Sequence, residues 1–483
     1  MRVLHVAAEL YPWVRTGGLG DVIGGLPAAL AAEGADVRLC LPGYALLLDA
    51  ARENEVARLA TPFAVERVRI GLARLPGAPP AYIVDHPAFY DRPGGPYGGP
   101  DGGVFPDNDR RFGLLSWVAA ALADGADPDW RPAIVHGHDW HAGVMPAYLR
   151  ARGRPAASVF TVHNLAYQGF FGAGTFAELA LPPEFFSIDG VEFYGGVSFM
   201  KAGLFYADRL TTVSPTYAAE IQTPRYGENL HGLLRARADV LSGILNGVDP
   251  GVWNPSGDPA LPAVYGVDDA AVGRAAAKAM LQRRFGLAGD AAAPLFATVT
   301  RLTPQKGMDL VVAALPGLVA LGAQFALLGS GDAGLEQGFA TAAALQPGQL
   351  GAVIGYDEGL SRLIFAGADA VVVPSRFEPC GLTQLYALRY GAVPVVRRTG
   401  GLADTVVDAT PDTLADGSAT GFAFDDETAP ALLSAMERAV TLYRDPPGWR
   451  RVVRRGMTRD FSWGTAARRY LALYRELVPT PPP

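Results

Sequence analysis

Short apolar runs rich in β-branched residues alternate with longer helical patterns along the chain. This alternation limits the possible folds more than any other feature. In the first half, such runs cover residues 3–8, 37–41, 81–84, 134–136, 159–162 and 210–213. Continuous apolar strands separated by helices are typical of a parallel sheet that helices cover on both faces. The pattern therefore predicts an α/β domain of the Rossmann-like kind.

The second half repeats this pattern, with apolar runs at 295–299, 325–328, 352–354, 370–373 and 393–396. A chain of 483 residues is also longer than one hydrophobic core usually supports. The turn-rich segments 246–250 and 254–257 place a boundary between two such domains near 246–265. We predict domains at 1–250 and 251–460. The remaining segment, 461–483, is expected to form a helix that crosses back to the first domain and to end in a frayed polyproline tail.

The composition excludes several classes of protein. Apolar residues make up 49% of the chain, the net charge is only −7, and no run of arginine or lysine occurs. A nucleic-acid partner is therefore not expected, because such proteins need a basic surface. Two cysteines do not make a disulfide framework, and no apolar segment reaches the roughly 20 residues that span a bilayer. The first apolar run is too short for a signal peptide, so we expect a cytoplasmic protein without membrane contacts.

Ligands of open α/β sheets bind beyond the carboxyl ends of the strands, so the loops after the strands are the places to search for a site. The sequence R-T-G-G-L-G at 15–20 follows the first strand and opens a helix. Its glycines allow a phosphate to approach backbone N–H groups. It is not a dinucleotide fingerprint, because a G-x-G-x-x-G that starts at Gly18 would need glycine at Ile23. A simple tight turn is the competing interpretation.

Two cations follow the first strand of the second half, in T-R-L-T-P-Q-K-G at 300–307. Arg301 offers a two-pronged donor and Lys306 a compact charge, and together they suit a diphosphate. The alternative is a solvated basic turn. Nearby, Tyr356 follows another strand, where its ring can stack on a base, although a tyrosine is more often packed than bound to a ligand.

The segment P-S-R-F-E-P-C-G-L-T at 374–383 lies between a strand and a helix. Glu378 can accept hydrogen bonds from sugar hydroxyls, although a glutamate near a helix start can also be an ordinary cap. The backbone N–H groups at the helix start suit phosphate oxygens. For Cys380 we favour a packing role over a catalytic one.

Four of the seven histidines lie in H-G-H-D-W-H at 136–141 and in T-V-H-N-L at 161–165. A zinc site is disfavoured, because the first two histidines alternate on a strand end and no matching cysteine set is present. These two histidines remain candidates for interior packing. We expect Asp139 and His163 to bind sugar hydroxyls and Trp140 to stack on a sugar ring.

Taken together, these segments resemble the bacterial glycogen (starch) synthase family. The resemblance spans nearly the whole chain and rests on R-T-G-G-L, H-D-W-H, T-V-H-N-L-A-Y-Q-G, N-G-V-D, T-R-L-T-x-Q-K-G, P-S-R-F-E-P-C-G-L-T-Q and R-R-T-G-G-L-A-D-T-V. It implies a retaining glycosyltransferase of the GT-B type, with two Rossmann-like domains that face each other across a deep cleft. It also implies that ADP-glucose is the donor, that an α-1,4-glucan such as glycogen is the acceptor, and that no metal or other cofactor is required.

For the donor side, the resemblance implies that Arg301 and Lys306 hold the diphosphate and that Glu378 binds the glucose 3- and 4-hydroxyls. It implies that Tyr356 flanks the adenine. The backbone is expected to approach phosphate oxygens at Gly18 and along Cys380, Gly381, Leu382 and Thr383.

For the first domain, the acceptor side, the resemblance implies that His163 and Asn246 contact the transferred glucose and that Asp139 lies close to the reacting centre. The cleft is expected to be lined by Tyr97, Trp140 and Asn164.

The chain departs from the family pattern at two positions. Arg15 stands where the family's glycine loop usually has lysine, so the phosphate contact made there is open. Tyr386 stands where related transferases carry a second glutamate, so recognition of the ribose by a carboxylate is not implied.

Two other functions stay open from sequence. One is a transferase that uses UDP-glucose or another acceptor. The other is a catalytically silent glucan-binding protein, against which speak the intact Glu378, His163, Arg301 and Lys306. A nicotinamide dehydrogenase is disfavoured by Ile23.

Overall fold

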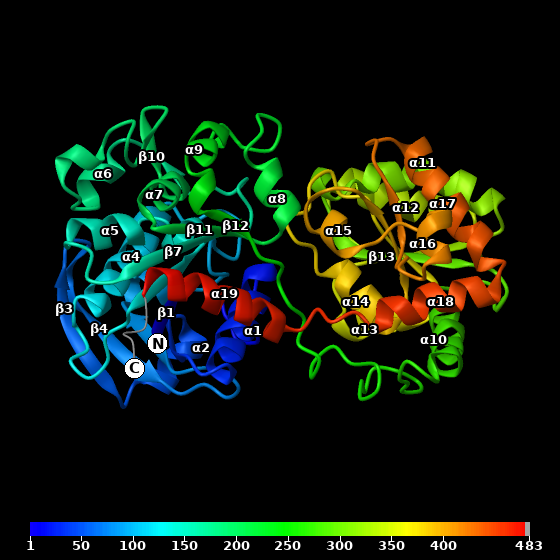
Figure 1. The fold of residues 1–483 in the computed structure, drawn as a ribbon, viewed down its shortest axis with the longest axis horizontal. Helices are drawn as coiled ribbons and strands as arrows, with labels where there is room; N and C mark the ends of the chain where they lie inside the picture. Colours follow the sequence, from blue (N-terminus) through cyan, green and yellow to red (C-terminus); the bar gives the residue numbers. More distant parts are fainter. Residues whose placement is uncertain (479–483) are drawn as a thin grey trace. The chain divides into compact units, whose positions relative to one another are not determined.

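In the computed structural model, which describes residues 1–478 but not the side chains of 64–66, the chain divides into two compact units (Figure 1). Unit 1 comprises Met1–Gly247 together with Ser462–Pro483, and unit 2 comprises Val248–Phe461. This division lies close to the one placed after residue 250 from sequence, and the last segment belongs to the first unit. The polyproline tail expected at 479–483 lies outside the described residues.

Unit 1 is built on a sheet with the strand order β12-β11-β7-β6-β1-β2-β5-β4-β3. The strands from β12 to β5 pair in parallel, and β4 and β3 add an antiparallel hairpin at one edge. Their bounds are β1 (Arg2–Val6), β2 (Asp36–Pro42), β3 (Glu55–Thr61), β4 (Ala64–Ala73), β5 (Ala81–Asp85), β6 (Ile134–His138), β7 (Ala157–Val162), β11 (Arg209–Thr212) and β12 (Leu241–Gly243).

The hairpin of β3 and β4 was missed from sequence. β3 carries charged residues and none of its residues is buried, so it has no continuous apolar run. A small antiparallel sheet of β8 (Phe170–Phe171), β10 (Gly196–Ser198) and β9 (Glu192–Phe193) was missed for a similar reason, because its strands are too short to show a period.

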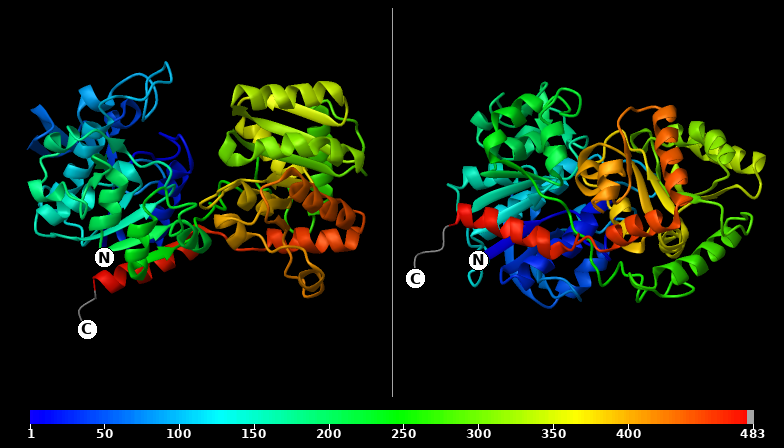
Figure 2. Two further views of the ribbon diagram at one scale, coloured as in Figure 1. Left: turned by 90° about the horizontal axis from the view of Figure 1, so that it is seen from above. Right: turned by 45° about the vertical axis from the view of Figure 1, so that its right-hand side comes forward.

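The α-helices of unit 1 are 4 to 16 residues long. They are α1 (Gly18–Ala32), α2 (Ala45–Leu48), α3 (Pro87–Tyr90), α4 (Asn108–Ala123), α5 (Met145–Ala151), α6 (Thr175–Glu178), α7 (Phe199–Tyr206), α8 (Pro215–Glu220), α9 (His231–Ala236) and α19 (Trp463–Leu477). Helix α19, red in Figures 1 and 2, lies beside α1, which is blue. Gly25 permits this contact, since a Cβ there would stand 2.0 Å from the indole nitrogen of Trp463.

Unit 2 is built on a wholly parallel sheet with the order β15-β14-β13-β16-β17-β18. Its strands are β13 (Leu295–Leu302), β14 (Gln324–Gly331), β15 (Leu350–Ile354), β16 (Ala370–Val373), β17 (Val393–Arg397) and β18 (Phe422–Phe424). Its helices are α10 (Ala270–Arg284), α11 (Met308–Ala320), α12 (Ala333–Leu345), α13 (Glu358–Gly367), α14 (Thr383–Tyr390), α15 (Gly400–Thr405), α16 (Pro411–Ala415), α17 (Ala429–Tyr443) and α18 (Pro446–Met457).

The predicted α/β class with two Rossmann-like domains is confirmed. Two separate apolar clusters pack in unit 2, as a sheet buried on both faces requires. Among the described residues, no helix combines the length and the apolar character needed to cross a membrane.

Each main sheet has a point where the strand order reverses, which is where open α/β sheets bind ligands. In unit 2 it lies between β13 and β16, because the chain continues from β13 to β14 on one side and from β16 to β17 on the other. In unit 1 it lies between β1 and β6 for the same reason. In each unit, the loops that follow these two strands therefore carry candidate site residues.

Candidate active site

The loops after β13 and β16 bring two predicted site residues into contact. Lys306 ends the short helix η5 (Pro304–Lys306), and its Nζ lies 2.6 Å from Oε2 of Glu378. The same carboxylate oxygen accepts a hydrogen bond from the hydroxyl of Ser375 at 2.7 Å. Because Glu378 is only 7% exposed, a cation and a hydroxyl hold its carboxylate in one orientation.

Further hydrogen bonds tie the two loops together. The backbone N–H of Arg376 donates to the carbonyl of Gln305, and the side-chain amide of Gln305 donates to the carbonyl of Phe377. The buried guanidinium of Arg397 donates to the carbonyl of Arg376. These hydrogen bonds fix the positions of the two loops that carry Lys306 and Glu378.

A third loop contacts the backbone of Glu378. Its sequence was part of the family resemblance, but no site residue was predicted in it. The N–H of Gly401 donates to the carbonyl of Glu378 at 3.0 Å. Gly400 has φ 45°, and a Cβ there would stand 2.0 Å from the same carbonyl oxygen. The pair of glycines in R-R-T-G-G-L was the available signal, since a close backbone approach requires glycine.

The other predicted donor residues of unit 2 are less tightly held. Arg301 is exposed at the end of β13, and within residues 1–478 no ion pair forms on its guanidinium. Tyr356 is 73% exposed after β15. Cys380 is buried, in keeping with a packing role. Gly381 has φ 72°, and Leu382 is the N-cap of α14, so the backbone N–H groups of this segment stand at a helix start.

Tyr386 has a structural partner. Its ring stacks on Trp253 with the ring centroids 3.8 Å apart and an angle of 16° between the planes. Aromatic packing occupies the position where related transferases are expected to have a glutamate.

In unit 1, the loop after β1 is organised by Glu9, which sequence analysis overlooked. This buried carboxylate accepts hydrogen bonds from the backbone N–H groups of Thr16 and Gly17 and from the hydroxyl of Tyr97. Two amides of the glycine loop are therefore engaged inside the protein. Arg15 forms an ion pair with Asp21 at 3.1 Å.

Gly18 begins α1, so its own N–H remains at the helix start where an anion is favoured. Tyr97 also stacks on His141, with the ring centroids 4.6 Å apart. The glycine loop and the loop of Tyr97 are thus linked through one carboxylate.

Asp139 follows β6 with a backbone that few residues adopt, since its φ of 57° is in the left-handed region. Its Oδ1 accepts hydrogen bonds from the N–H groups of His163 and Asn164. Burial raises the pKa of Asp139 to about 7, against the lowering effect of these two backbone hydrogen bonds. Backbone strain and a shifted side-chain pKa often occur together at functional residues.

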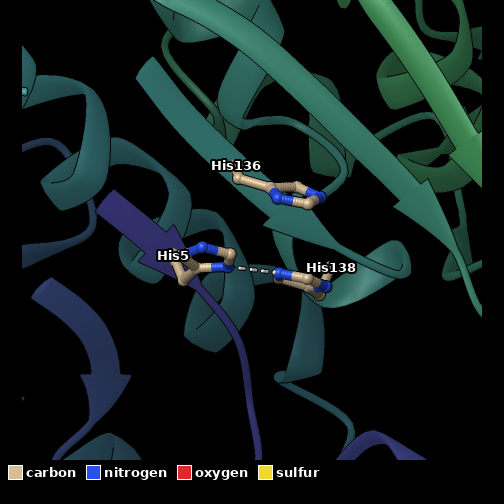
Figure 3. A group of neighbouring side chains, drawn as sticks. All are labelled: His5, His136 and His138. Carbon is tan, nitrogen blue, oxygen red and sulfur yellow. Dashed lines mark hydrogen bonds between the residues drawn. The ribbon is translucent and has the colours of Figure 1, made fainter. Parts of the chain in front are cut away.

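A layer of histidines crosses the strands β1, β6 and the end of β7. Figure 3 shows His5 and His138 joined by a hydrogen bond, with His136 stacked nearby. Nδ1 of His5 lies 2.9 Å from Nε2 of His138, and Nδ1 of His138 lies 3.0 Å from Nε2 of His163. Both ring nitrogens of His136 are bonded to hydroxyls, those of Tyr474 and Thr161.

These contacts also bear on metal binding. The ring nitrogens of His5, His136 and His138 lie within 4.8 Å of one another. However, five of the six nitrogens already take part in hydrogen bonds to rings or hydroxyls. The donor set therefore fits a hydrogen-bonded layer rather than a metal centre.

The remaining predicted residues of unit 1 lie in the loops after β6, β7 and β12. Trp140 packs against Phe112 with ring centroids 5.0 Å apart, and it is partly buried. The side chain of Asn164 accepts a hydrogen bond from the N–H of Ala166. Asn246 is buried, and its amide makes no hydrogen bond within the described part of the chain.

Comparisons with known proteins identify the family of the chain. Residues 2–236 match the family described as starch synthase catalytic domain, and residues 283–449 match glycosyl transferases group 1. A protein named glycogen synthase from Serratia proteamaculans is 54% identical over 479 residues, which cover 99% of this chain and 100% of that protein. The chain belongs to the glycogen synthase family.

Solved structures extend the comparison to the fold. The catalytic domain of starch synthase IV from Arabidopsis thaliana, solved bound to ADP and acarbose, superposes with a TM-score of 0.87 at 34% identity and covers 99% of both chains. Sucrose-phosphate synthase from Thermosynechococcus elongatus, at 18% identity, 99% and 98% coverage and a TM-score of 0.59, shares the fold alone. As a glycogen synthase family member, the chain is a retaining glycosyltransferase with the GT-B type of fold.

Proposed function

We propose that the enzyme transfers glucose from ADP-glucose to the non-reducing 4-hydroxyl of an α-1,4-glucan and keeps the α-configuration. The observation that carries this proposal is the Lys306–Glu378 pair at the strand-order reversal of unit 2. It sets a cation for phosphate and a carboxylate for sugar hydroxyls side by side. The ADP and acarbose bound to the related starch synthase IV support the same pairing of nucleotide and glucan.

In this proposal unit 2 binds the donor. Arg301 and Lys306 neutralise the diphosphate, and the N–H groups at the start of α14 add partial positive charge. The carboxylate of Glu378 accepts hydrogen bonds from the glucose 3- and 4-hydroxyls, while Ser375 and Lys306 keep it oriented. Tyr356 is proposed to flank the adenine. No metal or other cofactor is required, because side chains and backbone amides supply the positive charge.

Unit 1 is proposed to contact the sugar that is transferred. His163 and Asn246 donate to its oxygens, and Asp139 lies near the reacting carbon. Tyr97, Trp140 and Asn164 serve the acceptor. Arg15 is already paired with Asp21, so we propose that it assists the phosphates less directly than a free cation would.

The chemistry is a displacement at the anomeric carbon. The bond from this carbon to the leaving diphosphate oxygen breaks, and the acceptor 4-hydroxyl oxygen bonds to the carbon on the same face. The departing phosphate takes the hydroxyl proton, so the products are ADP and a glucan one unit longer. A glycosidase-like route through a covalent intermediate needs a free carboxylate nucleophile. Glu378 is engaged by Lys306 and Ser375, and Asp139 by two backbone amides.

Incorporation of labelled glucose into glycogen tests the proposal, with ADP-glucose and UDP-glucose supplied in parallel reactions. We expect ADP-glucose to be the better donor and the product to be degraded by an enzyme specific for α-1,4 linkages. Efficient use of UDP-glucose would replace the donor assignment. No incorporation from either donor, with nucleotide release also absent, would leave a glucan-binding protein.

A further inference from the structure

A chain of three imidazole rings leads from the interior of unit 1 to His163. The rings come from neighbouring strands, with His5 in β1, His138 at the end of β6 and His163 just after β7. Two ring-to-ring hydrogen bonds, of 2.9 and 3.0 Å, connect them. His5 and His138 are fully buried, so water does not compete for these bonds.

Each ring is neutral. Burial lowers the pKa of His5 and of His163 to about 3, and it lowers the pKa of His138 well below its usual range, with the neighbouring histidines adding to the effect. A neutral imidazole has one N–H donor and one acceptor nitrogen. Each ring that donates at one nitrogen must therefore accept at the other, and the two hydrogen bonds must point the same way along the chain.

Two arrangements satisfy this rule, and they differ at the buried end. Nε2 of His5 is buried and has no hydrogen-bond partner among the described residues. If the bonds ran inward from His163, that atom would carry an unpaired N–H. If they ran outward, it would carry only an unpaired lone pair. Buried unpaired N–H groups are the rarer of the two in proteins, so the outward direction is favoured.

From this geometry we infer that His5 and His138 are positioning residues that hold His163 in the tautomer protonated at Nδ1. His5 donates from Nδ1 to Nε2 of His138, and His138 donates from Nδ1 to Nε2 of His163. Nδ1 of His163 makes no hydrogen bond within residues 1–478 and is left as a donor. The inference rests on the proposed function, in which His163 contacts the transferred glucose, and it assigns that contact as an N–H donated to a sugar oxygen.

His136 is outside the chain, although it stacks within the same layer. Its two nitrogens bond to Thr161 and to Tyr474, and neither bond reaches His163. The substitution Tyr474→Phe is therefore a matched control, because it removes one hydrogen bond from a buried histidine of the layer and leaves the chain intact.

The tautomer can be measured directly in the full-length enzyme labelled with ¹⁵N-histidine, by two-bond ¹H–¹⁵N correlation spectra. The spectrum of His163→Gln assigns the signals of His163. We expect His163 to show the pattern of a ring protonated at Nδ1 in the wild type and in Tyr474→Phe. A wild-type ring protonated at Nε2 would overturn the inference, and this result does not depend on the activity.

Two substitutions of His138 then test the consequence for turnover. His138→Leu removes the donor, and we expect kcat to fall about 10-fold, the equivalent of one neutral hydrogen bond. His138→Asn places an amide N–H near the former Nδ1, and we expect it to restore most of kcat and the His163 tautomer. Equal losses in His138→Leu, His138→Asn and Tyr474→Phe would mean that the layer has only a packing role.

The two hypotheses fail in different ways. If the wild type transfers no glucose, the proposed function fails, yet the spectra still report the tautomer. If the wild type is active and His138→Leu leaves both the tautomer and kcat unchanged, only the positioning role fails.

Discussion

Lys306 and Glu378 are 72 residues apart in the sequence, yet Nζ of one lies 2.6 Å from Oε2 of the other. The ammonium group of Lys306 suits a phosphate, and the carboxylate of Glu378 suits sugar hydroxyls. The lysine side chain retains 19% exposure, whereas that of the glutamate retains 9%. The cation is therefore the member of the pair that a phosphate can reach more easily, and the carboxylate is the member that the surrounding loops hold.

Removing the lysine amine should slow the chemical step. We expect Lys306→Ala to lower kcat by roughly 10²–10³, as the loss of one stabiliser of a developing anion does in other enzymes. Initial rates with saturating ADP-glucose and glycogen measure this effect. The control is Arg284→Ala, which removes a positive charge from an exposed position at the end of α10. A kcat for Lys306→Ala within a factor of three of the control would remove Lys306 from its assigned role.

The backbone of Gly400 lies so close to the carbonyl of Glu378 that adding one methyl group at Gly400 should reduce activity. Gly400→Ala should displace the carbonyl of Glu378, because the new Cβ would overlap it, and we expect kcat to fall at least about 10-fold. Gly417 also has a positive φ, of 74°, but has no atom within 4 Å of a built Cβ. Gly417→Ala thus reproduces the backbone strain, about 1–2 kcal/mol, without the overlap. If the two variants lost the same activity, the contact at Glu378 would not matter.

Asp139 should make stability fall as pH rises. Its pKa is about 7 in the folded chain and near 3.8 when unfolded, so the folded state holds a proton that the unfolded state has lost. The stabilisation is complete below pH 4 and is lost as pH rises through 7, at up to about 1.4 kcal/mol per pH unit. Asn keeps an oxygen for the amides of His163 and Asn164, so Asp139→Asn should mainly remove this slope.

The difference between wild type and Asp139→Asn in unfolding midpoint, measured at a series of pH values from 4.5 to 8, isolates the effect of this carboxyl. Glu53→Gln, an exposed substitution in the same unit, is the control and should show the same change of unfolding midpoint with pH as the wild type. A constant difference across the series would contradict the assignment.

The buried histidines should make the stability of unit 1 fall as pH falls, which is opposite to the effect of Asp139. They should not affect unit 2. All seven histidines lie within Met1–Gly247, and none lies in Val248–Phe461. Burial lowers the pKa of His5, His136, His138, His141 and His163. The unfolded chain takes up these protons near pH 6.5, so the stability they allow at neutral pH is lost as pH falls from 6.5 toward 3.

Hydrogen exchange with mass spectrometry, corrected for intrinsic rates, resolves the two units. Between pH 7.5 and 5.5 we expect protection to fall in β1, β6 and β7 and to change much less in β13 and β16, which serve as the internal control. Equal loss of protection in both units would show that the histidine layer does not control acid stability.

Much of the fold followed from local pattern. β16 is a run of four apolar residues, all buried, and it was predicted with the bounds that the structure shows. Strands at sheet edges were missed, as with β3, because exposure on one or both faces removes the apolar run. The same limit applies to sites. Arg301, Lys306 and Glu378 were identified because charged residues after apolar strands are visible in one dimension. Glu9 also follows an apolar strand, but its role depends on contacts with Thr16, Gly17 and Tyr97 that form only in the folded chain.

The sequence by itself determined the elements and the chemical types, because side-chain periodicity and the residues that follow each strand are local properties. The tertiary structure alone decided which of these types meet. Strand order places the loop of β13 beside that of β16, so that Lys306 meets Glu378, and parallel register places His5, His138 and His163 in one line. Contacts between distant segments depend on which strands pair and in what register, and that choice is made by the packing of the whole sheet.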